Sequence, residues 1–178
     1  MAATEDLRYP VGKFNFDGEF TAEQRQKCIE DIAATPKKLR AAVQGLSAAQ
    51  LDTLYRPEGW TVRQVVHHVP DSHMNAFTRF KLALTEDEPT IKPYNEAEWA
   101  KLGDVPGTPV ETSLSLMDSL HERWVILLKS LTPEDLKRKF RHPELGLVTL
   151  ERSLAMYAWH GRHHVAHITS LRDRMGWK

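Results

Sequence analysis

Apolar residues recur every three or four positions along four long stretches of this chain, the spacing that gathers them on one face of an α-helix. The stretches run from about residue 21 to 46, 61 to 84, 108 to 131 and 149 to 174. Four long helices, each with one apolar face, bury those faces most simply against one another. The pattern therefore predicts an all-α fold, a four-helix bundle.

The starts of these helices carry capping signals. Three threonines are each followed three residues later by Gln or Glu, so that the two residues can satisfy free backbone N–H groups reciprocally: Thr21, Thr61 and Thr108. Pro109 then suits the first position of the third helix. Thr149 is expected to cap the last helix and Gly176 to end it.

Two of the predicted helices contain a proline, which removes a backbone hydrogen bond and crowds the preceding turn. Pro36 should bend the first helix or split it in two. Pro70 should kink the second helix beside its histidines.

The longest predicted connection, residues 85–108, is acidic at first and then rich in proline and glycine, with a helical turn expected at Ala97–Leu102. A crossover of this length commonly walls a pocket or contacts another subunit. The shorter pieces are a capped turn at 47–50, a loop at 55–59, a helical turn from Thr132, a turn at 142–146 and an extended piece at 147–148.

Residues 1–19 contain one proline and two glycines among aromatic residues, and we expect them to form an extended N-terminal arm. The aromatic residues favour an arm that docks on the body of the protein. A mobile tail is the alternative. The chain as a whole, residues 1–178, is long enough for a single domain with a full core.

Composition narrows the class of protein. The 24 Lys and Arg residues balance the 24 Asp and Glu residues, so no basic surface for nucleic acid or for a membrane is indicated. No apolar run is long enough to span a bilayer, and the N-terminus lacks the pattern of a signal peptide. The single cysteine, Cys28, excludes an intramolecular disulfide and lies on an apolar stripe, as a buried structural thiol would. A cytoplasmic protein is expected.

Four of the nine histidines fall between residues 160 and 167. On a helix His160, His164 and His167 share one face within about 60°, whereas His163 lies at its margin. Two imidazoles four residues apart on one face are spaced like a pair of metal ligands.

The second helix supplies candidates for a third ligand. Adjacent His67 and His68 point about 100° apart, so at most one of them should face the bundle. His67 lies nearly opposite the valine stripe, and His68 lies toward the margin of that stripe, which makes His68 the better candidate. His73 falls within the stripe and competes with it.

A site of His68, His160 and His164 would have three nitrogen ligands and an open position for water or substrate, as catalytic centres do. Neutral imidazoles suit Zn, Ni, Cu or Fe. Asp71, three residues after His68, could accept a hydrogen bond from a ligand or act as a base, and His167 could support a ligand. The alternative interpretation is a polar helix face with one or two hydrogen-bonded histidines.

The other motifs and residue types give less information about function. The zinc-protease motif HExxH is absent, because Gly161 stands where its glutamate would be. Three aromatic residues are expected in the core or a pocket wall: Trp60, Tyr157 and Trp159. Three arginines are expected in solvent rather than as anion clamps: Arg63, Arg79 and Arg162.

With these residues in view, the chain resembles the DinB-like superfamily, and within it the YfiT branch. Gly-Trp-Thr-Val-Arg-Gln-Val-Val-His-His-Val-Pro-Asp-Ser-His (59–73) is similar to the family's Trp-Ser/Thr opening with its His-x-x-Asp, and Tyr-x-Trp-His-x-x-x-His-x-x-His (157–167) to its C-terminal motif. Arg-Tyr-Pro-Val-Gly (8–12) and Met-Gly-Trp (175–177) resemble the two ends of the branch. Pro70 departs from the pattern, which commonly has a small residue there.

The resemblance implies a four-helix bundle, usually a homodimer, with one divalent metal ion held by three histidines. Carried over to this chain, the ligands are His68, His160 and His164, because the family's histidine follows the Trp by eight residues. Zinc is the first expectation for the metal, and nickel the second. Members of the branch are described as metal-dependent hydrolases, and related proteins transfer thiols such as bacillithiol or glutathione to electrophiles.

Three hypotheses about function follow. The first is hydrolysis by a metal-bound water, with a small-molecule substrate and Asp71 or a histidine moving the proton. The second is transfer of a low-molecular-weight thiol bound to the metal as thiolate. The third is a non-catalytic metal-binding protein of a stress response. Nucleic-acid binding is the weakest option, since no basic stripe is present.

Overall fold

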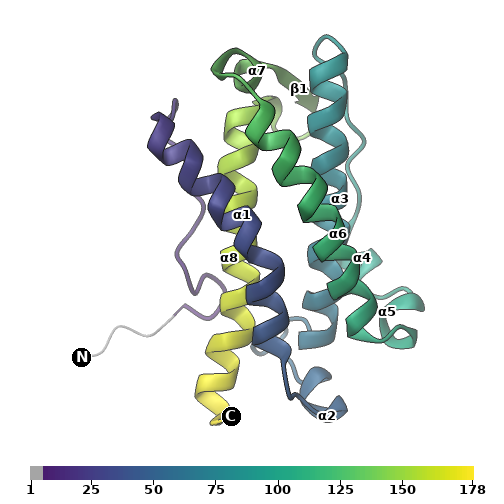
Figure 1. Cartoon of the computed structure of the whole chain (residues 1–178). Coiled ribbons are helices and arrows are strands. Elements are labelled where there is room, and N and C mark those ends of the chain that lie inside the picture. The colour runs from purple at the N-terminus through teal and green to yellow at the C-terminus, as the bar shows by residue number, and fades with distance from the viewer. Residues whose placement is uncertain (1–5) are drawn as a thin grey trace.

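The computed structural model describes residues 6–178, and four long helices account for most of them (Figure 1). They are α1 (Ala22–Val43), α3 (Val62–Thr85), α6 (Val110–Ser130) and α8 (Leu150–Met175). Helix α1 packs against α6 and α8, and α3 packs against the same two helices. This arrangement confirms the predicted four-helix bundle. Residues 1–5 of the expected arm lie outside the described residues.

The core of the bundle consists of two apolar clusters with a polar layer between them. One cluster lies toward the hairpin end and includes Phe80, Trp124 and Leu154, all fully buried. The other lies toward the opposite end and includes Leu39 and Ile168. His73 on α3, His121 on α6 and the buried histidines of α8 fall in sequence between the residues of these two clusters, whereas His67 and His68 fall among the valines of the second cluster.

Most of the predicted helix ends are confirmed. Thr21 and Thr61 form complete capping boxes, and Thr149 caps α8. Helix α8 ends at Gly176, whose φ of +65° is the left-handed conformation that glycine adopts without strain. Helix α1 ends at Val43, about three residues earlier than expected, and Gly45 beyond it has φ +78°.

The capping box predicted at Thr108 is wrong. Helix α6 begins at Val110 with Pro109 as its N-cap, and no side chain caps it. Glu111, the expected partner of Thr108, instead accepts hydrogen bonds from Arg40 of α1 at 2.7 Å through both carboxylate oxygens. A charged partner on another helix has displaced the local cap, because a charge-assisted hydrogen bond is stronger than a neutral one.

Neither internal proline splits its helix. Pro36 lies within the continuous α1 and Pro70 within the continuous α3. Both are buried, so packing of the apolar ring compensates for the missing backbone hydrogen bond.

The connections hold short elements. They are α2 (Ala48–Leu51), α4 (Glu96–Trp99), α5 (Asp104–Gly107), α7 (Pro133–Lys137) and the antiparallel strands β1 (Lys139–His142) and β2 (Gly146–Thr149). The predicted turns at 47–50, 132 and 142–146 are confirmed. Helix α5 lies where a loop was expected, and the extended piece at 147–148 proves to be half of a hairpin. Within residues 6–178 the structure contains no helix that is both long and apolar enough to cross a membrane.

Two long-range contacts hold the crossover between α3 and α6. The backbone N–H of Ile91 donates to the carbonyl of Arg141 on β1 at 3.0 Å, and the Arg141 N–H donates to the carbonyl of Pro89 at 2.9 Å. Farther along, the Gln64 side chain of α3 donates to the carbonyl of Ala100 at 2.9 Å. The crossover therefore lies against β1 and the start of α3.

Residues 6–19 contain no helix or strand and lie along α8. The indole N–H of Trp159 donates to the carbonyl of Gly12 at 3.0 Å, and Phe14 contacts the Trp159 ring. One ring nitrogen of His167 lies 3.2 Å from the carbonyl of Arg8. These contacts place the described part of the arm against the helix that carries the histidine cluster.

Candidate metal centre

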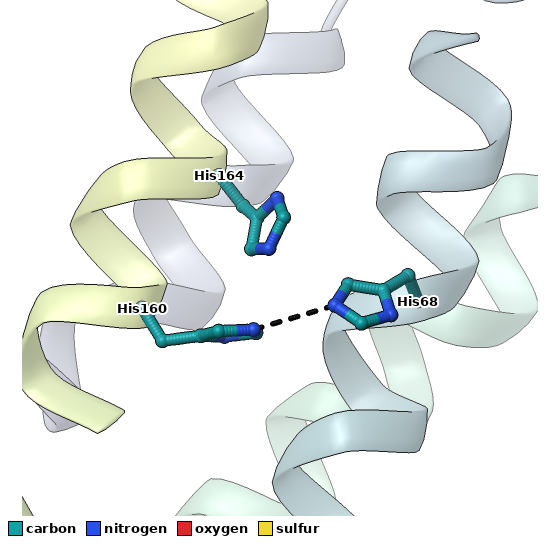
Figure 2. Close-up of side chains that lie close together, drawn as sticks. All are labelled: His68, His160 and His164. Carbon is teal, nitrogen blue, oxygen red and sulfur yellow. Dashed lines mark hydrogen bonds between the residues drawn. The ribbon is translucent and has the colours of Figure 1, made fainter. Parts of the chain in front are cut away.

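Three histidines from two helices converge at the polar layer of the bundle. His68 on α3 faces His160 and His164 on α8, and one ring nitrogen from each lies within 4.8 Å of the others (Figure 2). The Nε2 atoms of His68 and His160 are 3.3 Å apart. A tetrahedral zinc site with Zn–N bonds of 2.0–2.1 Å requires ligand nitrogens about 3.3 Å apart. The separation of His68 and His160 therefore fits two ligands of a single ion, and a ring nitrogen of His164 lies within 4.8 Å of both.

The local sequence explains why α1 and α8 lie so close at this level. Gly161 follows His160, and a Cβ atom built on it would collide with Oγ1 of Thr35 on α1 and lie 2.9 Å from its Cγ2. Glycine at this position lets α1 contact α8 between the two α8 histidines. The Gly161 that excludes the HExxH motif is thus a packing residue of the site.

All three rings favour the neutral form that binds metals. Burial lowers the pKa of His68 to about 4. It also lowers the pKa of His160 and of His164 well below the ordinary value for histidine, with the neighbouring histidines adding to the effect. The Nδ1 atom of His164 is buried without a hydrogen-bond partner among the described residues. Neutral imidazoles with ring nitrogens close to one another are the donor set that borderline divalent metals prefer.

A row of hydrogen-bonded imidazoles extends from His160 into the core. Nε2 of His73 lies 3.0 Å from Nδ1 of His160, and Nδ1 of His73 lies 2.8 Å from Nε2 of His121 on α6. Nδ1 of His121 lies 2.7 Å from the carbonyl oxygen of Ile32 on α1. His73 and His121 are 0% and 2% exposed, respectively. The row thus joins all four helices of the bundle.

His73 was expected to compete with His68 for the metal, but its two ring nitrogens are engaged in this row instead. Sequence reasoning missed His121, which lies on the apolar face of the third predicted helix. A polar residue on a core face was the signal that could have identified it.

The expectation that at most one of His67 and His68 faces the bundle is wrong. Both are 5% exposed, and Nδ1 of His67 lies 2.7 Å from the hydroxyl of Ser113 on α6. Because α3 is packed between α6 and α8, two residues 100° apart on it can both be buried, each against a different neighbour.

His163 and His167 lie on the side of α8 that the N-terminal arm covers. His163 stacks on Trp159 with ring centroids 4.3 Å apart, and His167 stacks on Tyr55 at 4.0 Å. His167 contacts His164 by its edge, with centroids 5.3 Å apart, but its recorded hydrogen bond is to Arg8. The support of a ligand by His167 stays a prediction, and its observed contact with His164 is ring packing.

Asp71 has an unusual environment but no hydrogen bond to the three converging rings in the described part of the chain. Burial raises the pKa of its carboxyl group to about 6, and the charge of Asp104 on α5 contributes. Its role as a base stays a prediction. Trp60 meets the His68 ring edge-on at 4.7 Å and Tyr157 contacts the His160 ring, as expected for residues that wall a site.

A cavity of about 600 Å³ adjoins the three converging histidines. His160, Ser72 and Tyr157 line it on one side. The crossover contributes Pro93, Tyr94, Asn95 and Glu96, and the hairpin contributes a further wall. The prediction that the crossover walls a pocket is confirmed. Of the three histidines, His160 is the partly exposed one, and it is the one that lines this cavity.

The remaining expectations have mixed outcomes. Arg63 pairs with Asp52 at 2.7 Å and Arg162 with the buried Asp31, so these two arginines are structural rather than free in solvent. Arg79 lines the cavity. Cys28 is half-buried against the core rather than fully buried, and burial raises the pKa of its thiol, which disfavours a nucleophilic thiolate.

Comparison with known proteins agrees with this geometry. The model of the DinB superfamily matches residues 31–168. A protein of Bacillus mycoides (strain KBAB4) is 57% identical over 97% of this chain and 99% of its own length, and one of Bacillus cereus (strain B4264) is 56% identical over the same shares. Both carry the name "Putative metal-dependent hydrolase".

Solved structures are also similar. The structure of YfiT from Bacillus subtilis, described as "a probable metal-dependent hydrolase with an unusual four-helix bundle topology", matches with a TM-score of 0.94. It is 48% identical, and the match covers 97% of this chain and 99% of that one. A four-helix bundle protein named TT2238 matches with a TM-score of 0.57 at 18% identity, which is a similarity of fold alone.

Proposed function

This chain belongs to the DinB superfamily, and we propose that it is a metal-dependent hydrolase whose ion is held by His68, His160 and His164. The observation that carries the proposal is the convergence of three neutral imidazoles, each with a ring nitrogen within 4.8 Å of the others, next to a cavity of about 600 Å³. The names of the similar Bacillus proteins support the same class of activity.

An ion bound by three neutral ligands keeps its full charge, and so supplies Lewis-acid chemistry and a water acidic enough to attack near neutral pH. The protein's own residues would hold the ion and orient its ligands. Burial keeps the three rings unprotonated, and the row behind His160 holds that ring at its Nδ1 atom. Because His160 lines the cavity, a molecule bound there reaches the metal centre from that side.

Three polar side chains of the cavity wall are suited to orient a substrate. Ser72, Tyr94 and Tyr157 carry hydroxyl groups and line the cavity together. Burial raises the pKa of Tyr94 to about 12 and raises that of Tyr157, so both phenols keep their protons at neutral pH. A phenol that keeps its proton can donate a hydrogen bond to a carbonyl oxygen of the substrate.

Zinc is the proposed ion and nickel the alternative, since both accept an all-imidazole donor set. Metal analysis of the purified protein distinguishes them. We expect about one ion per chain in the wild type and a loss in His68→Ala, His160→Ala and His164→Ala. His142→Ala is the control, because His142 lies on β1 outside the triad. Full occupancy in any one of the three variants would remove that residue from the proposed ligand set.

The reaction class is tested with the metal-loaded protein. We expect hydrolysis of activated esters or amides that is abolished by a chelator and restored by the ion, and that is absent in the three variants. Turnover only of a thiol together with an electrophile would replace hydrolysis by thiol transfer, the alternative chemistry of the same site. An absence of any turnover in a protein that binds metal would favour a non-catalytic role.

A further inference from the structure

The row of rings from His160 to Ile32 determines which nitrogen of each ring carries the proton. At its end the carbonyl oxygen of Ile32 can only accept a hydrogen bond, so Nδ1 of His121, 2.7 Å away, must be the donor. In a neutral ring the other nitrogen then holds the lone pair. Nε2 of His121 is therefore an acceptor.

The same reasoning passes from ring to ring. His73 must donate from Nδ1 to His121 across 2.8 Å, which leaves Nε2 of His73 as an acceptor. His160 must then donate from Nδ1 to His73 across 3.0 Å, which leaves the lone pair of His160 on Nε2. That is the atom that faces Nε2 of His68 at 3.3 Å. None of His73, His121 and His160 hydrogen-bonds a carboxylate within residues 6–178. Burial lowers the pKa of His121 by more than the charge of Asp118 raises it, so the ring stays neutral.

We infer that His73 and His121 are positioning residues that fix His160 as an Nε2 metal ligand, with the Ile32 carbonyl as the anchor of the row. A ligating histidine usually donates its second N–H to a single carbonyl or carboxylate. Here the imidazoles of His73 and His121 lie between the His160 ring and the Ile32 carbonyl. Through them the carbonyl fixes the direction of every hydrogen bond along the row. The inference rests on the proposed metal site, but its first test does not use a metal.

The first test is a long-range ¹H–¹⁵N NMR spectrum of the wild-type protein with chelator at pH 7.5, which reports the protonated nitrogen of each histidine. We expect the proton on Nδ1 and the lone pair on Nε2 in His73, His121 and His160. His68 should then carry its proton on Nε2 in the metal-free protein, since it faces an acceptor. A proton on Nε2 of His160 would overturn the inference, whatever the protein's activity.

The second test measures zinc affinity by competition with a chelator. Loss of a residue that orients a ligand typically weakens metal binding about 10–100-fold. We expect that loss in His73→Phe and in His121→Phe, and recovery to within about threefold in His121→Gln, whose amide oxygen can accept from His73. His67→Phe is the matched control, because His67 is a buried histidine on α3 outside the row. Equal affinities in the Phe and Gln variants of His121 would show that the ring only fills space.

A separate observation concerns the far part of the cavity. Arg79 on α3 lines it, is half-buried and pairs with no carboxylate within residues 6–178, and its guanidinium donates a hydrogen bond to the phenol of Tyr157 on the same wall. Arg152 on α8 lines the same cavity, with its guanidinium 5.9 Å from the centre of the Phe14 ring. Five other arginines pair with carboxylates elsewhere: Arg25, Arg40, Arg63, Arg141 and Arg162.

Two acidic residues also line the cavity but do not neutralise Arg79. Glu96 belongs to α4 and Glu144 to the turn of the hairpin; both are exposed, and neither appears in an ion pair with an arginine of the described chain. Along α3, Arg79 follows Ser72 by seven residues, which is about 10 Å of helix rise. A guanidinium thus stands about two helical turns from Ser72, whose hydroxyl lies 3.5 Å from Nε2 of His160, on a wall of the same cavity.

We propose that Arg79, with Arg152 beside the same cavity, binds a carboxylate group of the substrate, so that the enzyme acts on acyl compounds with an acidic end. A guanidinium matches the planar, bidentate geometry of a carboxylate, and a half-buried one gains most from such a partner. The proposal deepens the proposed hydrolase function. It predicts binding even when the metal is removed.

Calorimetric titration of the chelator-treated protein with octanoate and with octanamide tests this. We expect octanoate to bind at least about tenfold more tightly, a preference that Arg79→Gln removes, since a charge-assisted hydrogen bond to a carboxylate contributes more than a neutral one. Arg123→Gln is the control, because Arg123 is exposed on α6 and does not line the cavity. No preference in the wild type, or a preference that persists in Arg79→Gln, would overturn the proposal. Intact octanoate binding without ester hydrolysis would instead count against the hydrolase function alone.

Discussion

Nε2 of His73 lies 3.0 Å from Nδ1 of His160, so a ring that is fully buried in the core holds a ring that lines the cavity. His160 is therefore the point at which the interior of the bundle meets the space where a substrate would bind. Changes made deep in the core, at His73 or His121, should be felt at the metal centre through this contact.

Metal binding should stabilise the fold, because the proposed ligands come from two helices that unfolding separates. With free zinc at about 100 times its dissociation constant, the expected gain in free energy of unfolding is about 2.7 kcal/mol. Thermal melts with zinc and with chelator measure it. His164→Ala should show no zinc-dependent shift in melting temperature, and a shift of wild-type size in that variant would argue against His164 as a ligand.

Gly161→Ala should destabilise the protein by about 1–3 kcal/mol, the usual cost of overpacking a close contact. The added Cβ would collide with the Thr35 side chain where α1 meets α8. In a Thr35→Ala background the same change should cost much less, because the colliding Oγ1 and Cγ2 atoms are removed, only the Cβ contact at 3.2 Å remains, and alanine favours helix. Urea unfolding of the wild type, the two single variants and the double variant measures the four free energies that this comparison needs. A loss of equal size in both backgrounds would place the strain elsewhere.

Acid should destabilise the metal-free protein between about pH 6.5 and 4. Burial lowers the pKa of His68, His121 and His167 to about 4 in the folded protein, whereas the unfolded chain takes up these protons near pH 6.5. Within that window the unfolded state binds more protons, so stability falls as the pH falls, by about 1.4 kcal/mol per pH unit for each such ring.

This pH dependence is measured by urea unfolding with chelator at several pH values. His121→Phe removes one of the titrating rings, and the slope of stability against pH should decrease by about one proton. A wild-type stability that stays constant from pH 7 to 4.5 would contradict the neutral, buried state of these histidines.

Arg162→Ala should cost about 1–3 kcal/mol of stability, because it leaves the carboxylate of Asp31 buried with one partner fewer. Asp31 is 5% exposed and pairs with both Arg162 of α8 and Lys27 of its own helix. Lys27→Ala is a control on the same carboxylate. Its side chain is 69% exposed, so its loss should cost less than about 0.5 kcal/mol. Equal costs for the two variants, measured by chemical unfolding, would contradict this ranking.

Local chemistry was sufficient to predict much of the fold. The apolar periodicity predicted the four helices, and capping residues predicted most of their starts. The error at Thr108 shows where such reasoning stops, since Glu111 has a charged partner, Arg40, that is 71 residues away in the sequence. The error at His67 has a similar cause, because a helical wheel gives the angle of a side chain but not the number of neighbouring helices that cover it.

The convergence of the three histidines was predictable in part. The spacing of His160 and His164 on one helix face indicated two ligands, and the margin of the valine stripe favoured His68. The supporting row was not predictable from spacing, because His73, His121 and the Ile32 carbonyl lie on three different helices. Their contacts depend on the rotation and height of each helix relative to the others.

The sequence alone determined which residues can share a helix face, since the rise and twist of a helix are the same wherever it occurs. Tertiary structure decided which of those faces meet. It also decided the chemistry of the site: two apolar clusters enclose the histidine layer, and that burial keeps its rings neutral. Desolvation is a property of the packed chain. Packing therefore decided which histidines became the three candidate ligands and which two became the residues that support His160.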